Sequence, residues 1–377
     1  MPIFYIRYDS PRIRKYLFRT ENFLRYRILR PAISWLAWIF YGKRHFKSHS
    51  VSLNGKPLKK GISFVMPARD EEYTLKPCLE SLVGVIDQFI LIDNGSRDGT
   101  LEIMRDFQER MEGKAEVMVL ERPGATLIDM RQEGLSLIEY NWMIRGDADM
   151  VFTPAIKEIR RLALEQKRAT AIYLKKFNLH GDLDHKHRIG APYSGEFFMR
   201  NIDSTIKIIE YYGRIEHARI PLYYRMVDPK KLAFFHIDCS KPNERLIYRT
   251  CYLDWREAKN TIKGTPDFEE YQKLWTLHNF GTLNPESLQY RYSRLIASSC
   301  VALVESELKE LPKPLKDQTQ EAPFRFFIEY RNEKPYLRHD RENPLTQNYQ
   351  PTKEDEAWVP SMEKFKSDKI RKGFSFS

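Results

Sequence analysis

Short apolar runs that alternate with amphipathic segments between residues 62 and 145 constrain the fold of this chain most strongly. Four runs have the length and the Ile, Val and Phe content of buried strands, at 62–66, 88–92, 115–120 and 142–145. The segments between them, 74–85, 100–113 and 125–140, have apolar residues at helical spacing. Strands that alternate with helices of this length predict an α/β domain built on a mainly parallel sheet.

Polar clusters follow the first, second and fourth of these strands. They are PARDEE at 67–72, DNGSRDGT at 93–100 and RGDAD at 145–149. Open parallel sheets bind ligands beyond the carboxyl ends of their strands. We therefore expect the three clusters to form one binding site at that edge.

The RGDAD cluster has the strongest chemical signal. Asp147 and Asp149 are two carboxylates separated by one residue at a strand end, where they can converge on one hard cation, Mg²⁺ or Mn²⁺. Such a cation commonly bridges a diphosphate and stabilises the charge on it as it leaves. An ordinary solvated loop can contain the same Asp-x-Asp triplet. The metal-site interpretation therefore depends on the two other polar clusters that follow neighbouring strands.

The DNGSRDGT cluster has two interpretations. Asp93 projects from a strand end and can accept a hydrogen bond from a pyrimidine ring N–H or from ribose hydroxyls. Asp98 and Thr100 also suit an Asx-type turn that caps the next helix, a purely structural role.

The remaining chain divides by composition and pattern. Strands are expected at 171–177, 196–199 and 232–236, and helices from about residue 241, including one that Asn284 caps and that runs to about Leu311. The expected organisation is a basic aromatic N-terminal arm (1–60), the α/β domain (61–240), a helical extension (241–311) and an irregular C-terminal wrap or tail (312–377).

Residues 1–60 hold all of the excess positive charge. They contain fourteen Lys and Arg residues and two acidic residues, whereas the whole chain has a net charge of +11. Charge confined to one arm disfavours a nucleic-acid-binding domain. The apolar run 31–42, with Trp35 and Trp38 between basic flanks, is too short to span a bilayer; it either packs on the protein's own core or lies in a membrane interface.

The four cysteines do not suggest a disulfide framework or a zinc site. They are far apart, form no CxxC pair and follow no secretory signal at the N-terminus. We expect a reducing, cytoplasmic location, with an anionic membrane surface as a further partner through residues 1–60.

Taken together, PARDEE, DNGSRDGT and GDAD resemble the nucleotide-sugar-binding half of the family 2 glycosyltransferases with a GT-A fold, a DxD-containing, inverting family. The resemblance runs from about residue 62 to 154, and a weaker one continues through FMRN (198–201), YGRIEH (212–217) and FH (235–236). It implies a GT-A, Rossmann-like α/β domain. Two positions depart from the family pattern: Asp70 stands where Asn is usual, and Glu216-His217 reverses the usual His-Glu order.

The resemblance implies donor-binding roles for the residues that match the family motifs. Pro67, Arg69 and Glu71 would line the nucleoside pocket. Asp93 would hold the base or the ribose, and Arg131 would lie beside the nucleotide.

It also implies the metal site. Asp147 would bind the ribose edge, the metal and the diphosphate, with Asp149 as the firmer ligand of Mn²⁺ or Mg²⁺. His236 would complete the site, because a histidine is a suitable Mn²⁺ ligand. As an alternative, His236 is a hydrogen-bonded core histidine.

Inverting transfer needs a base that removes the proton from the acceptor hydroxyl. The candidates are Glu216 first, then His217, then Glu196 and Asp238. Each has a structural alternative as a surface or loop-anchoring residue.

Two further segments remain open. HGDLDHKH at 180–187 reads either as a metal-binding tract or, as we prefer, as a flexible polar loop on the acceptor side. The basic and aromatic segment 241–256 reads either as a phosphate contact or, as we prefer, as an ordinary amphipathic helix.

The expected function is a metal-dependent inverting glycosyltransferase that uses a nucleotide-sugar, first a UDP-sugar and otherwise a GDP- or dTDP-sugar, and a glycan or lipid-linked acceptor. One alternative is a nucleotidyltransferase on a similar fold, but no Gly-rich, Lys-containing phosphate loop follows the first strand. The other is a peripheral membrane or nucleic-acid-binding protein that uses the basic arm.

Overall fold

The computed structural model describes most of the chain between residues 57 and 359. The described residues are 57–165, 171–187, 193–200, 207–211, 215–219, 226–237, 243–261, 264–318, 328–331, 334–337 and 349–359, with scattered positions between 29 and 39. Most of the predicted arm lies outside them, so that prediction stays open. Within the described part, no helix is both long and apolar enough to cross a membrane.

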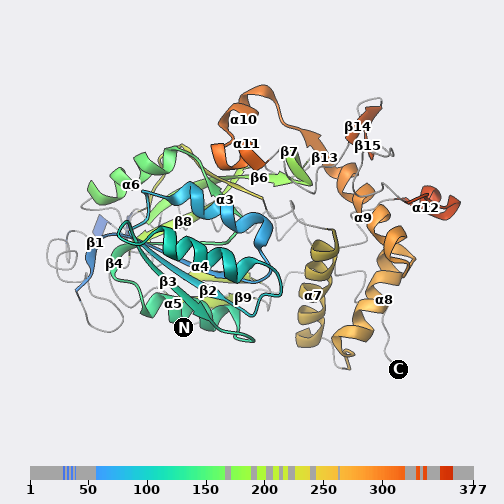
Figure 1. Ribbon diagram of the computed structural model, residues 1–377, viewed down its shortest axis with the longest axis horizontal. Coiled ribbons are helices and arrows are strands. Elements are labelled where there is room, and N and C mark those ends of the chain that lie inside the picture. The colour runs from blue at the N-terminus through green and yellow to red at the C-terminus, as the bar shows by residue number, and fades with distance from the viewer. Residues whose placement is uncertain are drawn as a thin grey trace.

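Four parallel strands form one end of the large sheet (Figure 1). They are β1 (Lys59–Ala68), β2 (Gln88–Asp93), β3 (Glu116–Glu121) and β4 (Tyr140–Arg145). Their order in the sheet is β4-β1-β2-β3, and each neighbouring pair is parallel. The register pairs Ala68 with Asp93, so the loops after β1 and β2 start side by side. The predicted α/β fold with a parallel sheet is confirmed.

Three helices connect these strands and cover both faces of the sheet. They are α3 (Glu72–Leu82), α4 (Thr100–Arg110) and α5 (Leu127–Ser136). Successive side chains of a strand point to opposite faces. Phe64 of β1 therefore packs in the core cluster that includes Phe107 of α4, whereas Val65 packs with Met130 of α5. Because both faces are covered, β1 is buried at every position from 62 to 66, including Ser63, whose hydroxyl donates to Gln88 Oε1.

Beyond β4 the sheet becomes mixed. Its further strands are β5 (Met150–Phe152), β6 (Ala171–His180), β7 (Asp182–His187), β8 (Tyr193–Arg200), β11 (Met226–Val227), β12 (Leu232–His236) and β13 (Cys300–Ala302), and α6 (Ala155–Glu165) lies between β5 and β6. Strand β8 runs antiparallel to both β4 and β6. The strand predicted at 232–236 is confirmed with the same bounds.

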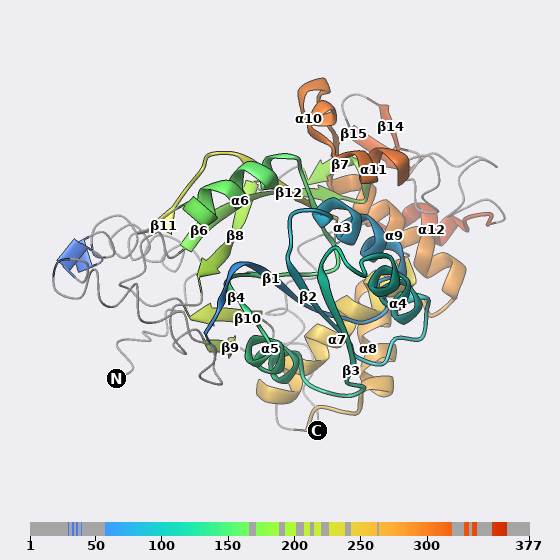
Figure 2. The same cartoon turned by 60° about the vertical axis from the view of Figure 1, so that its left-hand side comes forward.

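A separate hairpin lies beside α5 (Figure 2). Its strands are β9 (Lys207–Tyr211) and β10 (Ile215–Arg219). They pair antiparallel, with Glu216 opposite Glu210. The hairpin therefore lies against the helix that carries Arg131.

The helical extension forms its own core. Its helices are α7 (Asn243–Thr261), α8 (Phe268–Phe280) and α9 (Pro285–Ser299), which share a cluster that includes Trp275 and Phe280. The preferred reading of 241–256 as a helix is confirmed by α7. Helix α9 begins as predicted, with the Ser287 amide donating to Asn284 Oδ1 at 2.8 Å.

The prediction that this helix reaches Leu311 is wrong. Helix α9 ends at Ser299, and the next three residues form β13, which pairs antiparallel with β7. The same pairing overturns the prediction of a flexible loop at 180–187, because β7 is a strand of the large sheet. Backbone hydrogen bonds between segments more than a hundred residues apart decide both structures.

The chain after β13 packs partly on the α/β domain, through α11, and partly on α9. It contains α10 (Glu305–Glu310), α11 (Lys313–Gln318), β14 (Ile328–Arg331), β15 (Lys334–Leu337) and α12 (Lys353–Ala357). Leu311 and Leu315 are buried in a cluster with Phe177 of β6 and Phe235 of β12. This packing joins the extension to the sheet beside β12.

Candidate functional site

The loops after β1 and β2, residues 69–71 and 94–99, form one bonded unit that we call the paired loops. The Asp70 amide donates to Ser96 Oγ at 2.9 Å, and the Arg97 amide donates to Asp70 Oδ1 at 2.8 Å. The Glu71 amide donates to Thr100 Oγ1 at 2.6 Å. Two of the three predicted clusters are thus brought together at the carboxyl edge of the sheet.

Asp93 is buried at the end of β2, where its carboxylate organises its own loop. It accepts hydrogen bonds from the amides of Gly95, at 2.8 Å, and Ser96, at 3.1 Å. Gly95 has a φ of +74°, a conformation that glycine adopts at little cost. A carboxylate offers about four acceptor sites, so these contacts leave capacity for a ligand.

The other predicted donor residues lie around this loop pair. Pro67 is buried in β1, whereas the Arg69 side chain is 47% exposed and lies 3.8 Å from Asp70 Oδ2. Glu71 is half-buried and accepts a hydrogen bond from Thr74 Oγ1 at 2.7 Å. Of these residues, Arg69 is the one with a cationic group accessible to an anionic ligand.

Arg131 is buried and holds the GDAD cluster in place. Its guanidinium donates to the carbonyls of Val65 and Gly146, both at 2.6 Å, and to Asp147 Oδ1 at 2.5 Å. Arg131 is only 1% exposed, so it acts from beneath the site. It joins β1, the end of β4 and the first aspartate of the DxD triplet.

Gly146 is required sterically at this strand end. A Cβ at this position would lie 2.0 Å from the Phe64 ring, which fills the core under the sheet edge. The chain therefore approaches the core too closely for any side chain between Arg145 and Asp147. The close approach leaves the Asp147 side chain 42% exposed at the edge.

Asp149 and His236 meet from different parts of the sequence. Strands β12 and β5 pair so that His236 faces Met150, and the Ile237 amide donates to the Asp149 carbonyl at 2.9 Å. This register places His236 Nε2 3.3 Å from Asp149 Oδ1. The Asp149 side chain is 7% exposed and that of His236 is 20% exposed.

The predicted metal ligands are not all gathered into one cluster. Within the described ranges, no three His, Cys, Asp or Glu side chains lie close enough to hold a metal. Asp149 and His236 form a close pair, whereas Asp147 contacts Arg131.

Cys78 lies directly under this edge. Its Sγ is 3.6 Å from the Asp147 carbonyl, and burial, followed by the Asp149 carboxylate, raises the pKa of the thiol well above its ordinary value. The thiol is therefore neutral and inert, and it packs beneath the site.

Two candidate bases lie on the separate hairpin, and a third lies in the mixed part of the large sheet. Glu216 and His217 are neighbouring positions of β10, and Glu196 of β8 pairs in register with Leu174 of β6. The side chains at these positions, and all of Asp238, lie outside the described residues. The identity of the base stays a prediction.

The residues at 180–187 make structural contacts. His185 Nδ1 lies 2.6 Å from Asp182 Oδ1, and His180 Nε2 lies 2.8 Å from Ser299 Oγ. All of these side chains are buried where β6 and β7 meet the helical extension.

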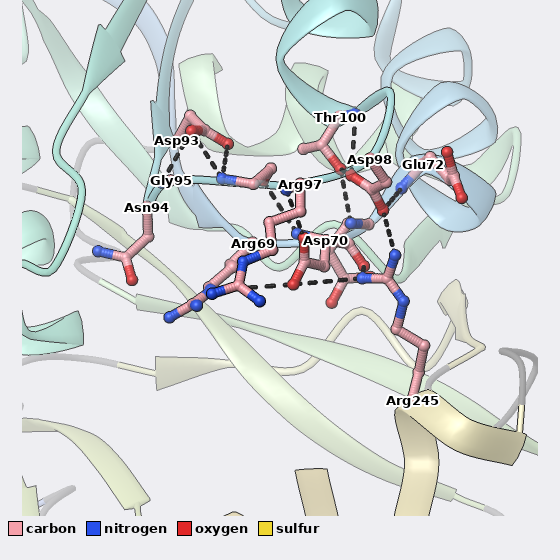
Figure 3. A network of polar contacts seen from close by, with 12 residues as sticks. Arg69, Asp70, Glu72, Asp93, Asn94, Gly95, Arg97, Asp98, Thr100 and Arg245 are labelled. Atoms are coloured by element: carbon pink, nitrogen blue, oxygen red, sulfur yellow. Dashed lines mark hydrogen bonds and ion pairs between the residues drawn. The ribbon is translucent and has the colours of Figure 1, made fainter. Parts of the chain in front are cut away.

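Sequence reasoning missed the role of Arg245. This residue of α7 contacts Asp70 and Asp98 of the paired loops (Figure 3). The mixture of basic and aromatic residues at 241–256 was the available signal, but it does not say which loops the helix meets.

Asp98 forms the Asx-type turn that was its structural alternative. Its Oδ1 accepts from the Thr100 amide at 3.1 Å, and its Oδ2 lies 3.1 Å from Arg245 Nη2.

A comparison with protein-family models gives one match to this part of the chain. Residues 63–215 match the model of glycosyl transferase family 2. No curated protein sequence matches the chain.

Two solved structures are distantly similar. S. aureus TarS 1-349 in complex with UDP-GlcNAc is 13% identical over 75% of this chain and 98% of that chain, with a TM-score of 0.37. Glucosyl-3-phosphoglycerate synthase from Mycobacterium tuberculosis, in complex with Mn²⁺ and UDP-glucose, is 22% identical over 32% of this chain and 44% of that chain, with a TM-score of 0.25. At these scores neither structure carries an argument about the site.

Proposed function

We propose that this chain, whose residues 63–215 match the model of glycosyl transferase family 2, is a glycosyltransferase. It transfers a sugar from a UDP-sugar to a hydroxyl of a glycan or lipid-linked acceptor, with inversion at the anomeric carbon and with a divalent metal. The observation that carries the proposal is the contact of Asp149 with His236 at the sheet edge. That edge also holds the paired loops.

The nucleoside would bind over the paired loops. The Asp93 carboxylate suits the ring N–H of uracil, and Arg69 offers an exposed cation to the phosphates. The bonds between the two loops hold these groups in place before the donor arrives. Preorganisation of this kind reduces the entropy that binding must overcome.

Asp149 and His236 would hold the metal. Carboxylate oxygen and imidazole nitrogen are ligand types that suit Mn²⁺, and Asp149 alone suits Mg²⁺. When bound, the cation would neutralise the charge that builds on the diphosphate leaving group. Asp147, fixed by Arg131, would then present its exposed carboxylate to the ribose or to the metal.

The acceptor hydroxyl would lose its proton to Glu216, with His217, Glu196 and Asp238 as the next candidates. The hydroxyl would attack the anomeric carbon from the face opposite the diphosphate. The hairpin that contains Glu216 lies against α5, the helix of Arg131, which supports Glu216 as the first choice.

A thermal-shift experiment on the full chain tests the donor and the metal together. UDP, GDP, dTDP and their sugars are compared with and without Mn²⁺ on the wild type, on Asp149→Ala and on the control Asp106→Ala. Asp106 is an exposed carboxylate on α4. We expect UDP to stabilise the wild type and the control when Mn²⁺ is present, and Asp149→Ala to lose the metal-dependent part.

Two results would contradict the proposal. If nucleotides stabilise the wild type equally with and without Mn²⁺, the proposed role of the metal in donor binding is contradicted. No shift with any nucleotide or nucleotide-sugar would remove the donor site, because a ligand at 100 times its Kd stabilises by about 2.7 kcal/mol.

We also propose that the arm of residues 1–60 holds the enzyme at an anionic membrane surface. Leu29, Trp35, Leu36 and Ile39 are between 46% and 64% exposed. Apolar side chains of this kind among basic residues suit a membrane interface. The full chain should sediment with vesicles that contain anionic lipid at low salt and be released at high salt. A chain that stays in the supernatant at low salt would refute this role.

A further inference from the structure

Arg245 connects the helical extension to both of the paired loops. It lies in the first turn of α7, and its Nη1 is 3.2 Å from the Asp70 carbonyl and 3.3 Å from Asp70 Oδ2. Its Nη2 is 3.1 Å from Asp98 Oδ2. Figure 3 shows the guanidinium between the two loops. One side chain, 175 positions from Asp70 in the sequence, thus contacts the loops that follow two different strands.

Charge explains why a cation is needed at this point. Asp70 and Asp98 are carboxylates that share one guanidinium, and Glu72 Oε2 lies nearby as the acceptor of the Gly99 amide, at 3.1 Å. The Asp98 side chain is 5% exposed and that of Asp70 is 25% exposed, so water screens their repulsion only in part. The fork of a guanidinium can hold two carboxylates at once, which an ammonium does less well.

Asp70 is the residue through which this contact affects the loops. It has a φ of +58°, a left-handed conformation that is uncommon for an L-residue, although Asp adopts it more readily than most. Its amide, its carboxylate and its carbonyl are all bonded, to Ser96, to the Arg97 amide and to Arg245 respectively. Loss of Arg245 would therefore release the Asp70 carbonyl and one contact of its carboxylate.

We propose that Arg245 is a positioning residue for the nucleotide site, through which the helical extension holds the paired loops in their binding conformation. Arg245 acts through Asp70 and Asp98, and the ligand meets the loops that they hold. The proposal rests on the proposed function for the identity of the ligand, but the order of the loops can be measured without a ligand. Removal of Arg245 should lower the fraction of molecules whose loops are ready to bind, and the apparent Kd rises in proportion.

The experiment uses the full chain with four substitutions. Arg245→Ala removes the contact, Arg245→Lys keeps the charge without the fork, and Asp70→Asn keeps the shape without the charge. Lys259→Ala is the control, since Lys259 lies on the same helix about 21 Å further along and stacks on Trp255.

Two measurements are made on each variant. Hydrogen exchange is followed in peptides that cover the paired loops, and UDP binding is titrated in the presence of Mn²⁺. We expect Arg245→Ala to speed exchange in these loops and to weaken UDP binding by about tenfold. Arg245→Lys should recover part of both effects, and Lys259→Ala should match the wild type. In turnover assays the KM for the donor should rise, while kcat at saturating donor stays within about twofold of the wild type.

The outcomes separate this proposal from the proposed function. If the wild type binds UDP and Arg245→Ala matches it in exchange and affinity, the positioning role is overturned and the glycosyltransferase proposal stands. If the wild type binds no nucleotide, the donor proposal fails, and exchange alone decides whether Arg245 orders the loops. Should Arg245→Ala fail to fold, Arg245→Lys and Asp70→Asn carry the same comparison.

Discussion

Arg131 and Asp147 join the interior of the protein to the edge of its candidate site. Arg131 is 1% exposed, yet its Nη2 donates to Asp147 Oδ1 at 2.5 Å, while the Asp147 side chain is 42% exposed. A buried arginine thus fixes the orientation of an accessible carboxylate. The residue that the family resemblance places beside the nucleotide reaches the site through Asp147.

Arg131→Met should destabilise the protein by about 2–4 kcal/mol, because the buried Gly146 carbonyl loses this donor and the Val65 carbonyl keeps only the Gly146 amide. Urea unfolding measures the change. Arg110→Met is the matched control: Arg110 pairs with Glu80 at the surface, where an ion pair contributes less than about 1 kcal/mol. Equal effects of the two substitutions would contradict the assigned role.

Gly146→Ala should destabilise the protein by about 1–3 kcal/mol, because the new Cβ would overlap the Phe64 ring. The shifted strand end should also weaken metal-dependent UDP binding. Gly99→Ala serves as the control, since a Cβ there would have its nearest neighbour, Glu72 Oε2, at 3.5 Å, an ordinary contact. Thermal unfolding of both variants checks the difference, and a Gly146→Ala protein as stable as the control would refute it.

Glu216→Gln should lower turnover by about 100-fold or more and leave UDP affinity unchanged, because the amide cannot accept the proton of the acceptor. UDP release from the donor in the presence of acceptor measures turnover. Glu210→Gln is the control, as Glu210 is the register partner of Glu216 in the same hairpin. If Glu216→Gln keeps full turnover, the base is His217, Glu196 or Asp238.

Asp355 should make stability depend on acidic pH. Its carboxylate is fully buried; burial raises its pKa, but hydrogen bonds from Ser287, Tyr349, Thr352 and Arg291 outweigh burial and hold the pKa well below its ordinary value. A carboxyl group whose pKa is lower in the folded state stabilises the fold above its unfolded value, near pH 4, and this stabilisation is lost as the pH falls.

Asp355→Asn tests this dependence. The variant should be less stable at pH 7 by about 2–4 kcal/mol, because the carboxylate and Arg291 form a buried pair at 2.7 Å. Its free energy of unfolding should then fall less steeply than that of the wild type between pH 5 and pH 3. If urea unfolding shows that the free energy of unfolding changes with pH equally in the variant and the wild type across this range, the prediction is contradicted.

The sheet core and the place of the candidate site could be predicted from local patterns. The strand at 232–236 was predicted to the residue, and the three polar clusters were correctly assigned to strand ends. These features depend on periodicity within about ten residues and on the general behaviour of parallel sheets. The start of α9 at Asn284 was predictable for the same reason, because a cap is a local hydrogen bond.

Strand β7 and the end of α9 could not be read in this way. The polar sequence HGDLDHKH resembles a loop, and the continuous helical pattern after Asn284 gives no reason to stop at Ser299. Both are decided by the pairing of β7 with β13, in which Cys300 lies opposite His187. Neither β7 nor β13 has a sequence pattern that predicts which strand it pairs with.

Local patterns in the chain predict the parallel α/β core, the strand ends that carry the candidate site and the carboxylates of the GDAD cluster. Contacts between distant segments place Arg131 beneath Asp147, bring His236 to Asp149 through the β5–β12 pairing, and bring Arg245 to the paired loops. The physical reason is the range of the interactions. Side-chain periodicity and capping act between near neighbours in the chain, whereas these three contacts form only when the folded core brings distant segments together.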